Sequence, residues 1–195
     1  MKHSSDIIIS DLCKSFDGQA VLSRLNLTLL SGASYCLMAP SGTGKTTLFK
    51  ILLGLEQPDA GFIDGLSGKK ISAVFQEDRL LEGYNAVQNL RFVTDRTKTT
   101  AQLAAFASRL LPPESLNKPV FEFSGGMKRR LALLRALAVP FDFLLLDEPF
   151  TGMDAATKQT AAELILEYKK NATLLFSAHD PKDALLLKSE IITIP

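Results

Sequence analysis

The pattern of apolar and polar positions predicts strands along the whole chain, with helices between the later ones. Residues 6–38 hold short strand-like runs with turns at Asp17-Gly18 and Ser31-Gly32, which predicts an antiparallel sheet. These runs are residues 7–9, 20–22 and 25–29. Later runs are almost entirely apolar, as expected of parallel strands buried on both faces, and they occupy residues 35–38, 71–75, 141–146 and 174–178.

Apolar residues recur at helical spacing in four other stretches, residues 45–55, 100–110, 127–138 and 155–169. Pro112 and Pro113 end the second of these helices. Since helical spacing dominates residues 77–137, we expect a helical insert there, within a single α/β domain. The core of that domain comprises residues 1–76 and 138–195, and its sheet is mainly parallel.

Composition places the chain among globular proteins, because 46% of its residues are hydrophobic and 22% are charged. No apolar run reaches the roughly 18 residues that span a bilayer, and the first residues are polar, so we expect a cytoplasmic protein. A net charge of +1 offers no general attraction for nucleic acid. Cys13 and Cys36 lie on separate predicted elements, which predicts two core thiols rather than a disulfide or zinc site.

Small residues separate the apolar run that ends at Met38 from the helical run that follows, a pattern typical of strand, tight loop and helix. The backbone N–H groups of such a loop, with the positive end of the helix dipole, form a cradle for a polyphosphate. Lys45 is placed to reach the terminal phosphates, and Thr46 offers a hydroxyl to a magnesium ion. The residues expected at the cradle are Pro40, Ser41, Gly42, Thr43, Gly44, Lys45, Thr46 and Thr47.

Ala39 stands where the G-x-x-x-x-G-K-[ST] pattern of such phosphate loops has its first glycine. The cradle's N–H donors are expected from Ser41 onward, and alanine adds only one methyl group at the strand end. We therefore expect Ala39 to be tolerated in place of the glycine. The pattern predicts that the domain has the core of a phosphate-loop nucleoside triphosphatase.

Two carboxylates, Asp147 and Glu148, end the buried strand at residues 141–146, at the sheet edge where open parallel sheets bind ligands. Asp147 suits the coordination shell of magnesium, and Glu148 suits a base that orients or deprotonates an attacking water. Read alone, the two acids could also be ordinary solubilising residues. The presence of the phosphate-loop pattern around Lys45 in the same chain weakens that interpretation.

Ser124, Gly125 and Gly126 begin a further helix with small residues that leave its first N–H groups open to an anion. The segment equally fits an ordinary helix-start loop. Phe16, at the first turn, fits either an aromatic ring that stacks on a nucleotide base or a strand-end core residue.

These segments, in this order, resemble the nucleotide-binding domain of ATP-binding cassette (ABC) proteins, from about residue 7 to residue 194. The resemblance assigns base stacking to Phe16, contact with magnesium and the attacking water to Gln76, and the switch histidine to His179. The other matches are the phosphate loop (residues 39–46), the signature segment (residues 124–126), the metal-binding strand end with Asp147 and Glu148, and the loop ending at Asp154.

Phe123 and Met127 replace the outer residues of the usual Leu-Ser-Gly-Gly-Gln signature, which puts fine positioning of the phosphate in question. The chain ends soon after His179, so we expect no C-terminal regulatory domain.

The resemblance implies a homodimer formed head to tail, with each ATP and its Mg²⁺ between the phosphate loop of one copy and the signature segment of the other. It implies membrane-spanning permease partners that dock near residues 76–81, a solute-binding protein, and a location on the inner face of the membrane. Residues 75–81 look most like those of sulfonate, taurine and nitrate importers. No nucleic-acid partner is expected.

Two rivals to this interpretation remain open. The first is a soluble cassette ATPase acting on DNA or ribosomes, although the chain has neither a long coiled coil nor a second cassette. The second is a nucleotide-binding regulator without hydrolysis, suggested by Ala39 and Met127.

Overall fold

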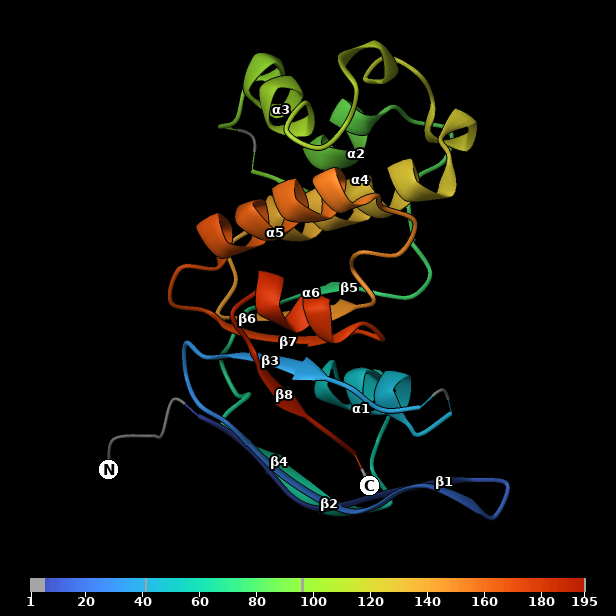
Figure 1. The fold of residues 1–195 in the computed structure, drawn as a ribbon, viewed down its shortest axis with the longest axis vertical. Coiled ribbons are helices and arrows are strands. Elements are labelled where there is room, and N and C mark those ends of the chain that lie inside the picture. Colours follow the sequence, from blue (N-terminus) through green and yellow to red (C-terminus); the bar gives the residue numbers. More distant parts are fainter. Residues whose placement is uncertain (1–5, 41, 96, 195) are drawn as a thin grey trace.

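The computed structural model describes residues 6–40, 42–95 and 97–194, which form two sheets and surrounding helices (Figure 1). The antiparallel sheet has the order β2-β1-β4, from β1 (Ile7–Phe16), β2 (Gln19–Leu29) and β4 (Ala60–Asp64). The parallel sheet has the order β5-β6-β7-β3-β8, from β3 (Ser34–Leu37), β5 (Ile71–Val74), β6 (Phe143–Asp147), β7 (Thr173–Ser177) and β8 (Glu190–Ile192). The helices are α1 (Lys45–Leu52), α2 (Ala86–Val93), α3 (Thr100–Ala107), α4 (Gly125–Leu137), α5 (Ala155–Lys169) and α6 (Pro181–Leu186).

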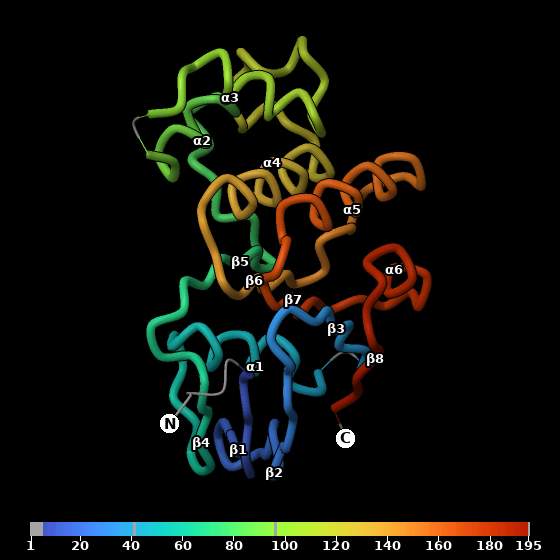
Figure 2. The backbone as a smooth tube through the Cα atoms, turned by 90° about the vertical axis from the view of Figure 1, so that its left-hand side faces the viewer, coloured from blue at the N-terminus to red at the C-terminus, as the bar shows by residue number. Residues whose placement is uncertain are grey.

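The parallel sheet is covered on both faces, which explains its continuous apolar strands. In Figures 1 and 2, α4 and α5 lie over one face with α2 and α3 beyond them, while α1 lies between the other face and the antiparallel sheet. Phe143 and Leu145 of β6 belong to the cluster with α1, and Leu144 and Leu146 belong to the cluster with α4 and α5. Alternate side chains of one strand thus fill two separate cores.

The predicted turn at Asp17-Gly18 is confirmed. Phe16 pairs with Gln19, and both turn residues have positive φ, 50° for Asp17 and 78° for Gly18. This geometry matches the right-handed twist of the two strands and favours Asp-Gly. The hairpin continues further than expected, because the predicted runs 20–22 and 25–29 are a single strand, β2.

Helix boundaries differ from the predictions by a few residues. The first helix ends at Leu52, not residue 55, since Gly54 with φ 69° breaks the helical path. The next predicted helix ends at Ala107, and the helix predicted from residue 127 starts at Gly125. The helix at residues 155–169 is confirmed. Among the α-helices and strands, the sequence pattern missed β4, α2, α6 and β8, and it also missed two short 3-10 helices, Pro113–Ser115 and Val120–Glu122.

The cysteine prediction holds for one residue only. Cys36 is fully buried in β3, and burial raises the pKa of its thiol to about 12. Cys13 is only partly buried, because the alternation along β1 places it on the outer face of the strand. The prediction of a core thiol is therefore wrong for Cys13. Among the residues described, no helix is both long and apolar enough to cross a membrane.

The predicted α/β fold class is confirmed by these two sheets and their helices. The predicted division into a core and an insert at residues 77–137 stays a prediction. Helix α4, at the end of that segment, contacts α2 and α3 and also β5 and α5 of the core.

Candidate functional site

Three strand ends meet at one edge of the parallel sheet. β7 lies between β6 and β3, and its last residue Ser177 pairs with Asp147 of β6 and Leu37 of β3. The chain leaves β3 through the phosphate loop and enters α1 at Lys45. This register brings the phosphate loop and Asp147 to the same edge, where parallel sheets bind ligands.

Glycine is required at the entry to α1. Gly44 has φ 92°, and a Cβ atom on it would lie 2.9 Å from the carbonyl oxygen of Val21 and 2.8 Å from the Leu22 side chain in β2. Gly42 also has a positive φ of 84°, but space around it is open. Ser41 lies outside the described residues. The phosphate loop is therefore packed directly against the antiparallel sheet.

Lys45 is buried, with 7% of its surface exposed, and its ammonium group points back into the phosphate loop. It donates hydrogen bonds to the carbonyl oxygens of Ala39 and, at 3.0 Å, Pro40. The Thr43 hydroxyl also donates to Pro40, at 2.8 Å. Ala39 packs against the core around α1, so its methyl group does not fill the cradle.

Asp147 and Thr46 offer hard oxygen atoms close together. Asp147 is 4% exposed, and its Oδ2 accepts a hydrogen bond of 3.1 Å from the Thr46 hydroxyl. Gln76 is exposed just beyond β5, whose last residue pairs with Leu146, next to Asp147. Magnesium is commonly held by one or two carboxylates together with substrate phosphates and water, so this donor set fits it. No cluster of three or more His, Cys, Asp or Glu that could hold a metal occurs within the described ranges.

Glu148 and His179 face each other across the ends of β6 and β7. Glu148 Oε1 lies 2.8 Å from His179 Nε2, and Thr151 donates to Oε2 at 3.3 Å. Glu148 has φ 51°, a left-handed conformation that a side-chain-bearing residue seldom adopts. A cavity of about 160 Å³ opens beside this pair. The sequence-predicted base and switch histidine are thus in direct contact.

The signature segment forms the start of α4. Ser124 caps the helix, accepting a hydrogen bond of 3.3 Å from the Met127 N–H. A Cβ atom on Gly126 would clash with the carbonyl oxygen of Gly152, whereas nothing lies within 4 Å of one on Gly125. Asp154 caps α5, and the hydrogen bond from the Thr157 N–H lowers the pKa of its carboxyl. In the part of the chain that the structure describes, no hydrogen bond or ion pair joins the signature segment to the phosphate loop.

Phe16 lies at the end of the β1–β2 hairpin with 44% of its surface exposed, so its interpretation as a core residue is wrong. The Lys14 ammonium lies 5.0 Å from the centre of its ring. Base stacking by Phe16 stays a prediction.

The residue patterns gave no role to Arg129, a buried arginine of α4. Its guanidinium donates to the backbone oxygens of Phe75, at 2.5 Å, and Gln76, at 3.2 Å. It also lies 3.2 Å from Asp78 Oδ1. Burial raises the pKa of the Asp78 carboxyl, and the charges of Arg129 and Lys128 oppose that rise. Only the tertiary contact shows that this side chain ties α4 to the segment holding Gln76.

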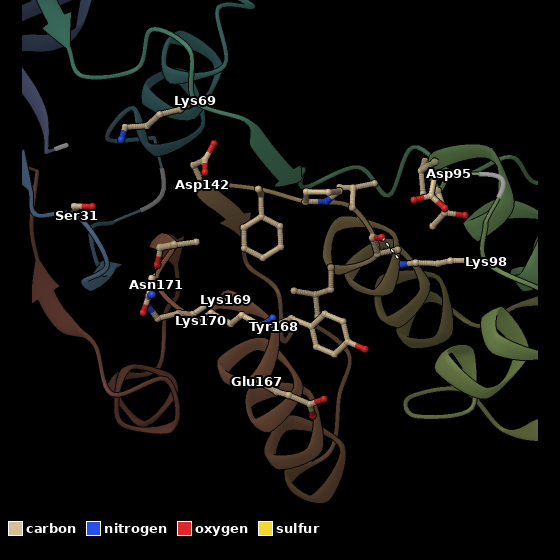
Figure 3. Close-up of a pocket in the computed structure, with 18 residues that line it drawn as sticks. Ser31, Lys69, Asp95, Lys98, Asp142, Glu167, Tyr168, Lys169, Lys170 and Asn171 are labelled. Carbon is tan, nitrogen blue, oxygen red and sulfur yellow. Dashed lines mark hydrogen bonds between the residues drawn. The ribbon is translucent and has the colours of Figure 1, made fainter. Parts of the chain in front are cut away.

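The larger cavity, of about 1070 Å³, lies at the opposite edge of the parallel sheet (Figure 3). Asp142 and Ala172, which precede β6 and β7, are among the residues lining it. Lys169 donates there to Gly32 and Ala172, and burial lowers the pKa of its ammonium group. None of the sequence-predicted site residues lines this cavity.

A family profile described as "ABC transporter" matches residues 22–151. An aliphatic sulfonates import ATP-binding protein from Nocardia farcinica is 37% identical over 192 residues, covering 96% of this chain and 77% of that protein. A taurine import ATP-binding protein from Pseudomonas aeruginosa is 38% identical, covering 90% of this chain and 72% of that protein.

A solved dimeric ATP-binding cassette, MJ0796 in a post-hydrolysis state with ADP and Pi, shares the fold. Its TM-score is 0.83 at 24% identity, and the match covers 96% of this chain and 94% of that one. The family profile and the relatives support a transporter ATPase over a DNA- or ribosome-directed cassette or a regulator. The chain therefore belongs to the ABC transporter family and is an ATP-binding subunit and ATPase of that family.

Proposed function

We propose that this chain hydrolyses ATP between the phosphate loop of one copy and the signature segment of a second copy, with magnesium. The observation that carries the proposal is the assembly of Lys45, Thr46, Asp147 and Glu148 at adjacent strand ends. The signature segment is a second anion-binding helix start, and among the described residues no hydrogen bond or ion pair within one copy joins it to this assembly.

Each residue of the assembly has a distinct task. The Lys45 ammonium exchanges the loop carbonyls for phosphate oxygens, which are stronger partners for a cation. Thr46 and Asp147 would hold magnesium, with Gln76 as a further oxygen donor from the neighbouring strand end. When bound, the ion would neutralise phosphate charge.

Glu148 is the proposed general base. Its carboxylate stands beside a cavity at the strand ends and receives orientation from His179 and Thr151. A positioned carboxylate of this kind accepts the proton of the attacking water. His179 fixes the direction of Oε1, so its first task is to position the base.

The proposed docking surface for a membrane-spanning partner follows Gln76. Leu81, Tyr84 and Phe92 are exposed there, and the rings of Tyr84 and Phe92 meet edge to face at 5.2 Å. Exposed aromatic side chains are enriched at protein interfaces. With sulfonate and taurine import proteins as relatives, we propose import of a small solute, with a solute-binding protein and location on the inner face of the membrane.

The test is nucleotide titration of Lys45→Ala. Loss of a charge-assisted contact worth about 1.5–3 kcal/mol lowers ATP affinity at least tenfold. Lys50→Ala is the matched control, because Lys50 is an exposed lysine of the same helix. Equal ATP affinity in wild type and Lys45→Ala would overturn the assignment of the nucleotide site.

A further inference from the structure

A serine ends the central strand of the parallel sheet. Ser177 follows four buried residues of β7, and none of its surface is exposed. Its strand lies between β6, which carries Asp147, and β3, which leads into the phosphate loop. A hydroxyl at such a fully buried position needs partners for both its donor and its acceptor function.

The Ser177 hydroxyl finds those partners on both acidic residues of the site. It donates a hydrogen bond of 2.6 Å to Asp147 Oδ1, and it accepts a hydrogen bond of 2.9 Å from the backbone N–H of Glu148. One hydroxyl therefore contacts two consecutive residues whose proposed tasks differ.

The contact with Asp147 sets the direction of its carboxylate. With Oδ1 held by Ser177, the other oxygen, Oδ2, is turned toward the Thr46 hydroxyl. Without that anchor, the carboxylate is free to rotate away from the proposed metal position.

The contact with Glu148 supports an unfavourable backbone conformation. A non-glycine residue in the left-handed region is in an unfavourable conformation and persists only when its surroundings hold it there. Glu148 has φ 51°, and from this conformation its carboxylate reaches His179. The hydrogen bond to the Glu148 N–H is one such restraint.

We propose that Ser177 is a positioning residue that orients Asp147 toward the metal and Glu148 toward the attacking water. The proposal rests on the function proposed above for these two acids. Partners that orient metal ligands typically affect metal affinity or activity about 10–100-fold. A merely structural hydroxyl would affect stability alone.

The same strand offers a matched control at its other end. Thr173 is 2% exposed, and its hydroxyl accepts the Gly32 N–H at 3.1 Å and donates to the Leu30 carbonyl at 3.5 Å. Thr173→Val removes a buried hydroxyl with the same two functions, four residues from Ser177 and away from the acids. Ser177→Thr keeps the hydroxyl of interest and serves as the rescue variant.

The experiment compares Ser177→Ala, Ser177→Thr and Thr173→Val with wild type. Affinity for a non-hydrolysable ATP analogue is titrated in EDTA and across a range of Mg²⁺ concentrations, with thermal unfolding and turnover measured alongside. For Ser177→Ala, we expect half-maximal Mg²⁺ to rise about 10–100-fold and kcat to fall, with analogue affinity in EDTA within about threefold of wild type. We expect Thr173→Val to lower thermal stability without changing the Mg²⁺ requirement. Ser177→Thr should have the Mg²⁺ requirement and kcat of wild type.

Three results would overturn the proposal. The first is an unchanged Mg²⁺ requirement in Ser177→Ala, and the second is the same Mg²⁺ shift in Thr173→Val. The third is a loss of analogue affinity in Ser177→Ala that is as large in EDTA as it is with Mg²⁺. If Ser177→Thr fails to fold, the comparison of Ser177→Ala with Thr173→Val still shows whether Ser177 positions the acids or only stabilises the fold. Failure of the proposed function would give a different result from failure of the Ser177 proposal, because wild type itself would then bind no ATP analogue.

Discussion

At the scale of single residues, two adjacent glycines of the signature segment separate a structural requirement from a functional one. Gly126 lies against the backbone of Gly152, and a methyl group there would clash with the Gly152 carbonyl oxygen. Gly125 has open space around its Cβ position within one copy and no positive φ. A requirement for glycine at residue 125 would therefore come from outside the copy.

We expect Gly126→Ala to lower the free energy of unfolding by about 1–3 kcal/mol, the usual range for an overpacked position. Gly125→Ala should leave that free energy nearly unchanged but weaken ATP-dependent dimerisation at least tenfold, because in the proposed dimer its methyl group would face the nucleotide of the second copy. Urea unfolding and light scattering with ATP measure the two effects. Unaltered dimerisation of Gly125→Ala would contradict the proposed role of the signature segment.

At the scale of elements, α4 connects two regions that the proposed mechanism uses. Its first residue follows the Ser124 cap, and Arg129, less than two turns later, holds the backbone of the Gln76 segment. Helix α4 thereby ties the proposed contact surface for the second copy to the region that follows β5. Since Arg129 is only 5% exposed, its three contacts lie largely out of water.

Arg129→Met is expected to lower the free energy of unfolding by about 1–3 kcal/mol, because it leaves two backbone oxygens and Asp78 without their cation. It also frees Gln76, so the Mg²⁺-dependent turnover falls more than nucleotide affinity does. Arg24→Met is the control, since Arg24 forms an exposed ion pair with Asp11, of a kind worth at most about 1 kcal/mol. Urea unfolding measures the change in stability for both variants. An equal decrease in the free energy of unfolding for the two variants would show that the contacts of Arg129 stabilise the fold no more than an exposed ion pair does.

The sequence pattern predicted the elements whose burial dictates their composition. β6 and β7 are buried on both faces, so their apolar runs stand out, whereas β4 is an edge strand with mostly exposed residues and no such pattern. Helix α2 was missed although Asn85 and Gln88 form a capping box at its start, a signal readable from their spacing. The motifs located Thr46 and Asp147, which are 101 positions apart in sequence. Arg129 and Ser177 have no motif of their own, because their tasks depend on contacts made only after folding.

At the scale of the whole molecule, the two proposed phosphate-binding segments belong to different layers. The phosphate loop joins β3 to α1 and packs on the antiparallel sheet through Gly44. The signature segment starts α4, on the other face of the parallel sheet (Figure 1). A single copy therefore offers each nucleotide only half of the proposed contacts, which makes a nucleotide-dependent dimer the expected assembly.

Glu148→Gln tests that assembly together with the proposed base. Glutamine keeps the size and a hydrogen-bonding partner for His179 but cannot accept a proton, and general-base catalysis contributes about 10²–10⁴-fold. Turnover should fall by that factor while ATP binding persists, because Lys45, Thr46 and Asp147 are unchanged. Removing one negative charge near the terminal phosphate also reduces repulsion. Light scattering should then show an ATP-bound dimer that accumulates in this variant and is transient in wild type.

Two controls accompany that measurement. Glu163→Gln changes an exposed carboxylate of α5 outside the site and should behave as wild type. Lys45→Ala should remain mostly monomeric at an ATP concentration that just saturates wild type, because its ATP affinity is expected to be at least tenfold lower. Turnover of Glu148→Gln within a few-fold of wild type would show that another group activates the water. A dimer present without nucleotide would instead show that the two copies associate through surfaces other than the phosphate loop and the signature segment.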